Sequence, residues 1–566
     1  MKLFKKFYSY VIAPERLFVY YLIAIMVPNL ALCFTEHMPL LADLCNMVLP
    51  ASVYAFLFTV RRKPGVMIWV LFPLVFFSAF QLVMLYLFGN SIIAVDMLLN
   101  VATTNFTEAT ELLNNIVPIV AGVFILYLPA LILGIFSIIR KDSIDNVFAA
   151  KARRYSIIGA IVGIALTVVC KLSYKDYRPL LHMFPANVCH NLTLAIERSY
   201  DMSHYDETST NFNYEARATH DKSRPEVYVL VIGETGRACN WGLYGYERNT
   251  TPRLSTREGV THFTDVLTQS NTTHKSVPMI MSLASAEDYD RIYNEKSIIN
   301  AFRQAGFYTA FFSNQRFNHS FIDIFGYEAD SVVFLKEGKS EDSNVSDMKL
   351  TENIKTLIAE GHDKLFIVLH TYGSHFNYCE RYEDSIAVYR PDNIVTASPK
   401  YRDKLINAYD NTIVQTDMFL DDIISTLAKD SISSALLYTS DHGEDIFDDS
   451  RNHFLHSSPI PTYYQMHVPF IIWTSEIFAN SYPNIMRNIN DNRNKPVASN
   501  QTIIHTMFDI AGITTPYHID SLSVASDSYN VTERHFINDH NKPVDYDKLG
   551  LEEEDYVQFK KHKIKM

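Results

Sequence analysis

The chain has 566 residues with a formal net charge of −12, and 48% of its residues are hydrophobic. Because this negative chain has no basic stripe, we expect no nucleic-acid partner. The six cysteines form no C-x-x-C metal pattern, and the sequence leaves open whether Cys33 and Cys45, which flank one short loop, form a disulfide.

The amino-terminal part is rich in long apolar segments. They cover residues 17–34, 40–60, 66–88, 116–139 and 155–172. Each segment approaches the roughly 20 residues that a helix needs to cross a bilayer. We therefore predict a transmembrane domain with five helices over residues 1–175.

The loops between these segments differ in their content of Lys and Arg. Basic residues precede the first segment and follow the second and the fourth, whereas residues 36–46 and 89–115 contain none. The positive-inside rule then places the amino terminus in the cytoplasm and everything after residue 172 on the opposite side of the membrane.

The remaining residues predict one large α/β domain. Strand-like apolar runs recur at residues 227–232, 308–312, 332–335, 365–369, 435–438 and 468–473, with helical patterns between them, notably at 404–427. Such alternation is typical of a largely parallel sheet covered by helices. We assign residues 224–537 to this α/β domain, the polar residues 176–223 to a linker and the charged residues 538–566 to a C-terminal tail.

Two of the strand-like runs end on side chains that bind metals. Glu234 follows one run, and Asp441 and His442 follow another. Open α/β sheets place their ligands at the carboxyl ends of the strands, and carboxylates and imidazoles are zinc ligands. Either motif alone is equally well explained as an ordinary polar loop, but the two together favour a zinc site.

A series of short motifs carries a specific resemblance. In chain order they are Gly233-Glu-Thr-Gly-Arg237, Gly245-Tyr-Glu-Arg-Asn-Thr-Thr-Pro252, Thr273-His-Lys-Ser-Val-Pro278, Leu369-His-Thr-Tyr-Gly-Ser-His375, Ala408-Tyr-Asp-Asn411, Ser440-Asp-His-Gly-Glu444 and Phe454-Leu-His456. With five amino-terminal spans, this order resembles the bacterial phosphoethanolamine transferases, which modify lipid A or lipopolysaccharide and are related to mobile colistin-resistance enzymes. The resemblance implies an alkaline-phosphatase/sulfatase-like fold for the soluble domain.

The resemblance also implies roles for individual residues. Glu234, Asp441 and His442 match the zinc ligands of the family. Thr273 matches its threonine nucleophile, which also contacts zinc, and metal coordination is one way to activate a hydroxyl. The residues alone do not show whether Thr272 or Thr273 is the nucleophile. The match of residues 276–278 to the family motif selects Thr273.

Two histidines match family positions beside the metal. For His375 and His456 this implies phosphate binding and proton transfer, or alternatively coordination of a second zinc. His453 is an alternative to His456 for the position beside the metal. His370 is better explained as a structural residue.

Further residues are predicted to bind substrate. Asn100, Thr104 and Glu108 share one face if helical, and their family counterparts hold the ethanolamine headgroup; a solvated amphipathic face is the alternative. Arg316 is predicted to grip a phosphate bidentately, with a surface role as the alternative. Gln269 and Met279 stand where relatives have the half-cystines that flank the nucleophile, so packing must hold this loop.

The function implied by the resemblance is transfer of phosphoethanolamine from phosphatidylethanolamine to lipopolysaccharide, with lipid A as the expected acceptor. It would proceed through a phosphothreonine-type intermediate with Zn²⁺, in a multi-pass protein of the bacterial inner membrane whose catalytic domain is periplasmic. The modified surface would resist cationic antimicrobial peptides.

The alternatives are a phosphoglycerol transferase of the lipoteichoic-acid-synthase type and a non-catalytic membrane-anchored sensor. A true sulfatase would need a C/S-x-P-x-R signature, which we do not find in the sequence.

Overall fold

The structure is a computed structural model that describes residues 13–36, 38–88, 92–103, 106–175, 177–220, 224–340, 344–394, 396–429, 432–531 and 533–566. Within these ranges, the side chains of residues 88, 100–103 and 106–116 are not described. The chain divides into two compact units, Met1–Leu98 with Leu112–Glu197 and Leu99–Glu111 with Arg198–Met566.

The first unit is built from apolar helices. Helices α2 (Pro14–Thr35), α3 (Leu40–Val60), α7 (Phe106–Ile139) and α8 (Asn146–Ser173) are long and apolar enough to cross a membrane. Helices α4 (Pro64–Val70) and α5 (Phe72–Phe88) form a pair bent by 62°, which makes a fifth span if the pair is counted as one. The described residues therefore contain four spans or five, and the predicted number depends on this bent pair.

Apolar residues face outward as well as inward in this unit. Ile125 of α7 is 76% exposed and Ile161 of α8 is 63% exposed, whereas Tyr21 and Phe58 are buried between helices. Helices that are apolar all round are typical of membrane spans. The buried Asn29 amide of α2 donates to Asn46 Oδ1 of α3 at 3.0 Å, a polar link of the kind that joins helices in lipid.

The cysteines of the first unit are free thiols. Cys45 is buried in a cluster with Cys170, Tyr177 and Met183, while Cys33 is partly exposed.

The second unit contains a seven-stranded sheet in the order β3-β11-β8-β2-β7-β5-β6. Its strands are β2 (Glu226–Gly233), β3 (Val260–His262), β5 (Tyr308–Ser313), β6 (Ser331–Phe334), β7 (Lys364–His370), β8 (Ser433–Ser440) and β11 (Phe470–Thr474). All six predicted strand-like runs lie in this sheet. The pairs between β8 and β6 are parallel, but β11 is antiparallel to both β8 and β3.

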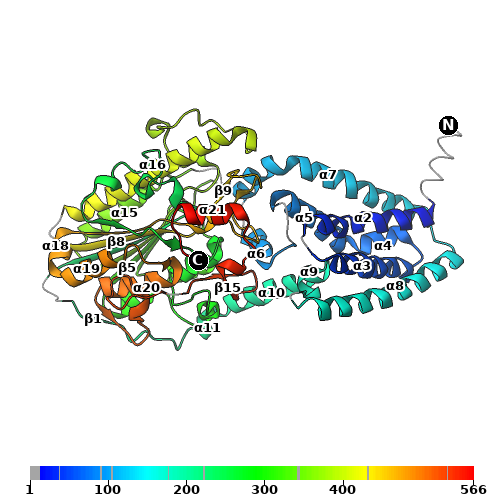
Figure 1. Cartoon of the computed structure of the whole chain (residues 1–566), viewed down its shortest axis with the longest axis horizontal. Coiled ribbons are helices and arrows are strands. Elements are labelled where there is room, and N and C mark those ends of the chain that lie inside the picture. The colour runs from blue at the N-terminus through cyan, green and yellow to red at the C-terminus, as the bar shows by residue number, and fades with distance from the viewer. Residues whose placement is uncertain are drawn as a thin grey trace. The chain divides into compact units, whose positions relative to one another are not determined.

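Alternate residues of β2 enter different cores. Tyr228, Leu230 and Ile232 pack with helices α12 (Thr273–Ile280), α13 (Ile298–Gln304) and α20 (Ser499–Ile510). Val227 and Val229 pack with α15 (Met348–Ala359) and α16 (Arg402–Ala428) on the other face (Figure 1). Burial on both faces explains why the strands are continuously apolar, and α16 contains the predicted helix at 404–427.

The strand register brings together the two motifs that were predicted to bind metal. Gly233 at the end of β2 pairs with Ser440 at the end of β8. Because the strands are parallel, Glu234 and Asp441 leave the sheet side by side at its carboxyl edge.

Shorter elements complete the chain. They are α6 (Val95–Thr103), α9 (Pro179–His182), α10 (Ala186–Ser203), α11 (Tyr205–Thr208), β1 (Arg217–Ala218), β4 (Val266–Leu267), α14 (Phe321–Gly326), β9 (Asp445–Ile446), β10 (Phe454–Leu455), α17 (Tyr463–Met466), α18 (Glu476–Ser481), α19 (Pro483–Asn492), β12 (Val497–Ala498), β13 (Ile513–Thr514), β14 (His535–Ile537), β15 (Pro543–Asp545) and α21 (Glu553–Lys561). The segments predicted as linker and tail therefore contain regular structure. In the latter, buried Asp555 of α21 accepts the Tyr463 N–H at 2.9 Å.

Gly373 allows the loop after β7 to pass close to the site. Its φ is +52°, and a Cβ there would lie 2.6 Å from the Glu234 carbonyl oxygen. We expect Gly373→Ala to cost about 1–2 kcal/mol for the left-handed backbone and about 1–3 kcal/mol more for the clash. Denaturation of the full chain in detergent measures this loss. Gly361→Ala is the matched control, since φ there is +80° but nothing lies within 4 Å of the added Cβ; equal losses would contradict the prediction.

Candidate metal centre and active site

Thr273 lies at the start of helix α12 with its hydroxyl among potential metal ligands. Its Oγ1 is 3.2 and 3.3 Å from the two carboxylate oxygens of Glu234 and 3.1 Å from Nε2 of His442. The residue is half-buried, whereas Glu234 and His442 are almost fully buried. The predicted nucleophile and two predicted ligands are thus in direct contact.

The donor atoms have the spacing of a zinc site. His442 Nε2 is 3.6 Å from Glu234 Oε1 and 3.3 Å from Asp441 Oδ2. Ligands at about 2.0–2.1 Å from a tetrahedral zinc stand about 3.3 Å apart. Among the described residues, Asp441 Oδ2 has no hydrogen-bond partner although it is buried. A buried carboxylate oxygen without a partner is costly, so these residues fit a metal ion.

The hydrogen bonds around the ligands orient them toward one another. Asp441 Oδ1 accepts the backbone N–H groups of His442 (2.7 Å) and Thr235 (3.2 Å), which leaves Oδ2 for the site. His442 Nδ1 lies 2.9 Å from the Gly443 carbonyl oxygen, so Nδ1 carries the proton and the Nε2 lone pair faces Thr273.

Burial sets the protonation of these groups. It holds the pKa of His442 well below its usual value, with the neighbouring His456 adding to the effect. The imidazole is therefore neutral and able to bind metal near pH 7. Burial also raises the pKa of Asp441 to about 6, because the ionised carboxylate is poorly solvated there.

His456 and His375 border the same centre. His456 belongs, with Glu234 and His442, to a group whose donor atoms lie within 4.8 Å of one another. Its ring centroid is 4.3 Å from that of His442 and 5.9 Å from that of His375. These distances agree with either predicted role of His456, which is metal coordination or contact with a phosphate.

His370 is the last residue of β7 and is buried, whereas His375, five residues later, is half-buried. Burial lowers the pKa of each to about 3, so both are neutral. His375 Nδ1 is 2.6 Å from the Phe376 carbonyl oxygen, which leaves Nε2 as its acceptor atom. His370 makes backbone ladder contacts with β2 and β5.

Glu444 is a residue of the site to which sequence reasoning gave no role. It is fully buried, and its Oε2 is 3.6 Å from Nδ1 of His456. The only signal for it was its place at the end of the Asp-His-Gly-Glu motif.

The predicted roles of the substrate-binding residues stay predictions. Thr104 and the side chains of Asn100 and Glu108 lie outside the described residues. The guanidinium of Arg316 donates to the Ser340 carbonyl at 2.5 Å, and its phosphate-binding role stays a prediction.

Arg237, the last residue of the motif from Gly233 to Arg237, forms an ion pair with the loop after Glu444. Its guanidinium makes two hydrogen bonds of 2.9 Å to the Asp448 carboxylate, and both side chains are only 3% exposed. We expect Arg237→Met to cost about 3 kcal/mol, because the buried Asp448 would lose two hydrogen bonds and keep only the partly exposed Arg402, at 3.0 Å, as a cationic partner. Chemical denaturation at pH 7 measures the loss. Arg253→Met is the control: its side chain is 50% exposed beside Asp421, so about 0–1 kcal/mol is expected.

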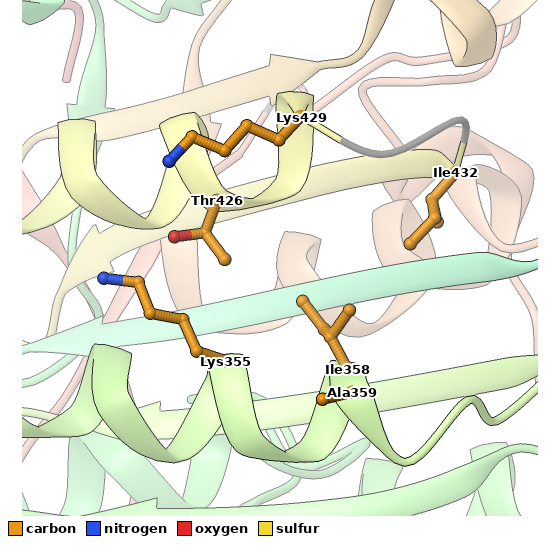
Figure 2. A pocket seen from close by; sticks show the side chains of 6 residues that line it. All are labelled: Lys355, Ile358, Ala359, Thr426, Lys429 and Ile432. Carbon is orange, nitrogen blue, oxygen red and sulfur yellow. The ribbon is translucent and has the colours of Figure 1, made fainter.

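A surface hollow lies at the opposite edge of the sheet. Its lining residues are Lys355, Ile358, Ala359, Thr426, Lys429 and Ile432 (Figure 2). Ile432 directly precedes β8 whereas Asp441 directly follows it, so the length of this strand separates the hollow from the metal centre. The Lys355 ammonium is paired with Asp422 at 3.1 Å, which weakens any attraction for an anion.

A second group of potential metal ligands, Asp509, His518 and Asp520, has a different geometry. Asp509 Oδ1 is 3.3 Å from Nε2 of His518, and Asp520 Oδ1 is 3.1 Å from Nδ1 of the same ring. One imidazole between two carboxylates forms two ion pairs when protonated. Consistently, the pKa of His518 is raised by its contact with Asp509 despite partial burial.

Known proteins share this architecture. The Kdo(2)-lipid A phosphoethanolamine 7''-transferase of Escherichia coli K12 is 30% identical over 297 residues, which are 49% of this chain and 50% of that protein. The integral membrane lipooligosaccharide phosphoethanolamine transferase A (EptA) of Neisseria meningitidis aligns over 90% of this chain and 98% of its own, with a TM-score of 0.70 and 21% identity. The zinc complex of the periplasmic domain of E. coli EptC covers 60% of this chain and 98% of its own, with a TM-score of 0.55 and 24% identity.

The matches support the fold over nearly the whole chain. The chain spans between 44% and 59% of the length of the curated relatives it matches. The Sulfatase family profile matches residues 226–513, which contain every predicted metal ligand and the predicted nucleophile. The chain therefore belongs to the sulfatase family.

Proposed function

We propose that this protein transfers phosphoethanolamine from phosphatidylethanolamine to lipopolysaccharide, with lipid A as the acceptor. Its place would be the bacterial inner membrane, with the sulfatase-like domain in the periplasm. The observation that carries the proposal is the Thr273 hydroxyl, 3.1 to 3.3 Å from His442 and Glu234 at the carboxyl edge of the sheet. The phosphoethanolamine transferases among the relatives support the choice of transferred group.

In the first half-reaction, Thr273 Oγ1 bonds to the phosphorus of the donor and the bond from phosphorus to the glycerol oxygen breaks. Diacylglycerol leaves with a proton, and phosphoethanolamine remains on the threonine. In the second half-reaction, a hydroxyl oxygen of the acceptor attacks the phosphorus and gives up its proton, the bond from phosphorus to Thr273 Oγ1 breaks, and Oγ1 takes up a proton. The chemistry thus divides one transfer between two displacements at the same phosphorus.

The residues divide the work between metal binding and proton transfer. Glu234, Asp441 and His442 would hold a zinc ion that, when bound, favours ionisation of the threonine hydroxyl and offsets charge on the phosphoryl oxygens. His456 and His375 would bind phosphoryl oxygens and carry protons to and from the leaving and attacking oxygens. The zinc-bound EptC domain, which has the same fold, supports the choice of metal.

The intact mass of the zinc-loaded full chain, after incubation with phosphatidylethanolamine, tests the proposal. We expect one added phosphoethanolamine and release of diacylglycerol. Adduct formation from phosphatidylglycerol alone would instead support a phosphoglycerol transferase. If zinc binds but neither lipid gives an adduct or diacylglycerol, the proposed reaction is wrong. Addition of lipid A to the adduct should return the protein to its original mass.

A further inference from the structure

The loop that carries Thr273 is held by a buried amide rather than by a covalent cross-link. All six cysteines of the chain are described, and all six are free thiols. Asn500, the second residue of helix α20, is fully buried beside this loop. Its Oδ1 accepts the Gln269 N–H at 2.6 Å, and its Nδ2 donates to the Ser276 carbonyl at 3.0 Å and to Ser276 Oγ at 2.8 Å.

The Asn500 side chain thus bonds to the chain both before and after the proposed nucleophile, Thr273. Gln269 lies four residues before Thr273, and Ser276 lies three residues after it. The orientation of the amide is determined by its partners, because the Gln269 N–H can only donate and the Ser276 carbonyl can only accept. Asn500 therefore closes the segment from 269 to 276 into a loop of defined shape.

The same network reaches the metal-ligand motif. The hydroxyls of Thr268 and Ser276 both donate to the Asp441 carbonyl oxygen, each at 2.6 Å. The other end of this residue, Oδ2, faces His442 Nε2 at 3.3 Å. Ser276 thus connects Asn500, the first turns of α12 and the backbone of Asp441.

Loss of the amide would affect the distance between Thr273 and the ligands. Without it, the buried Gln269 N–H loses its acceptor and the Ser276 carbonyl loses a donor, and each unsatisfied group favours a displaced loop. A second contact, from Asn271 Nδ2 to Gln465 Oε1 at 2.6 Å, holds the middle of the loop but does not reach Ser276 or Asp441.

We propose that Asn500 is a positioning residue that sets the place of the Thr273 hydroxyl relative to Asp441 and the metal centre. This inference rests on the proposed function, since it concerns the rate of the first half-reaction. Asn500 itself takes no part in bond making. A misplacement of about 1 Å can cost about 10²-fold in rate.

The test compares Asn500→Ala with Asn492→Ala in the zinc-loaded full chain. Asn492 is 2% exposed, and its Nδ2 donates to the Val524 and Ser526 carbonyls at 2.9 and 2.8 Å, so both variants lose a buried amide of similar bonding. For Asn500→Ala we expect adduct formation from phosphatidylethanolamine to slow about 10²-fold at saturating lipid, with bound zinc and the lipid concentration for half-maximal rate unchanged. Asn492→Ala should form the adduct at the wild-type rate. A wild-type rate in Asn500→Ala would overturn the inference.

Two further measurements keep the test decisive. Ser276→Ala removes only the hydroxyl between Asn500 and Asp441, and it should slow adduct formation about tenfold even if Asn500→Ala does not fold; an unchanged rate there contradicts the network. Amide hydrogen exchange over residues 268–276 should accelerate in Asn500→Ala and not in Asn492→Ala. If the wild type forms no adduct, the proposed function fails, and unchanged exchange in Asn500→Ala would separately overturn the positioning role.

Discussion

Thr273→Ala is expected to abolish the phosphoethanolamine adduct and to lower the transfer rate by about 10³-fold or more, as removal of a covalent nucleophile does. The Thr273 hydroxyl oxygen lies 3.1 Å from His442 Nε2 and 3.2 and 3.3 Å from the Glu234 carboxylate oxygens, and the alanine side chain has no group to replace it. Intact mass after incubation with phosphatidylethanolamine measures the adduct, and released diacylglycerol measures turnover.

Thr272→Ala is the matched control for this change. Thr272 precedes α12 directly, but its hydroxyl is directed at Ser270 Oγ, 3.1 Å away. The control should keep the adduct at nearly the wild-type rate. If Thr273→Ala formed the adduct and Thr272→Ala did not, Thr272 would be the nucleophile and our assignment would be wrong.

Asp441→Asn is expected to lose zinc. Its amide oxygen can still accept the backbone N–H of His442, but a neutral amide is a poor substitute for the buried carboxylate oxygen. Removal of a residue that only hydrogen-bonds to a zinc ligand lowers zinc affinity about 10–100-fold. We expect the loss of zinc affinity in Asp441→Asn to be larger. Metal content of the purified full chain and zinc titration after chelation measure the change.

Stability provides a second readout for the same variant. Zinc that binds only the folded state should raise the midpoint of thermal unfolding in the wild type and not in Asp441→Asn. Without zinc the variant should be no less stable than the wild type at pH 7. The reason is that burial raises the pKa of Asp441 to about 6, above its unfolded value, so its ionised form disfavours folding at pH 7 and the amide removes this effect.

Glu444→Gln distinguishes the proposed ligand set from its neighbour. Glu444 is buried in the same motif but contacts His456, with 3.6 Å between Oε2 and Nδ1. If Glu234, Asp441 and His442 hold the metal, this variant keeps its zinc. Loss of zinc from Glu444→Gln and not from Asp441→Asn would assign the metal to the side of His456 instead.

Much of the fold was predictable because strands and membrane spans follow from the hydrophobicity of consecutive residues. A strand buried on both faces needs consecutive apolar residues, and all six such runs are strands of the sheet. Membrane spans are equally local, since their length and polarity follow from the bilayer. The break between α4 and α5 was not predictable from hydropathy, because both halves are apolar.

Other features depend on partners that lie far away in the chain. The sequence gives no sign that β11 runs antiparallel to β8, since apolar periodicity carries no direction. The charged residues at 538–566 include α21, whose Asp555 is buried against Arg451 and Tyr463; only these remote partners make burial of the carboxylate favourable.

The sequence by itself determined the strand ends that carry Glu234, Asp441 and His442, because the change from apolar run to polar motif is contiguous. The tertiary structure alone decided that Gly233 pairs with Ser440, that Thr273 lies 3.1 Å from His442, and that Asn500 holds the loop from 269 to 276. Hydrogen bonds and contacts between side chains, at about 3 Å, join residues more than 150 positions apart, and no local pattern encodes such a distance.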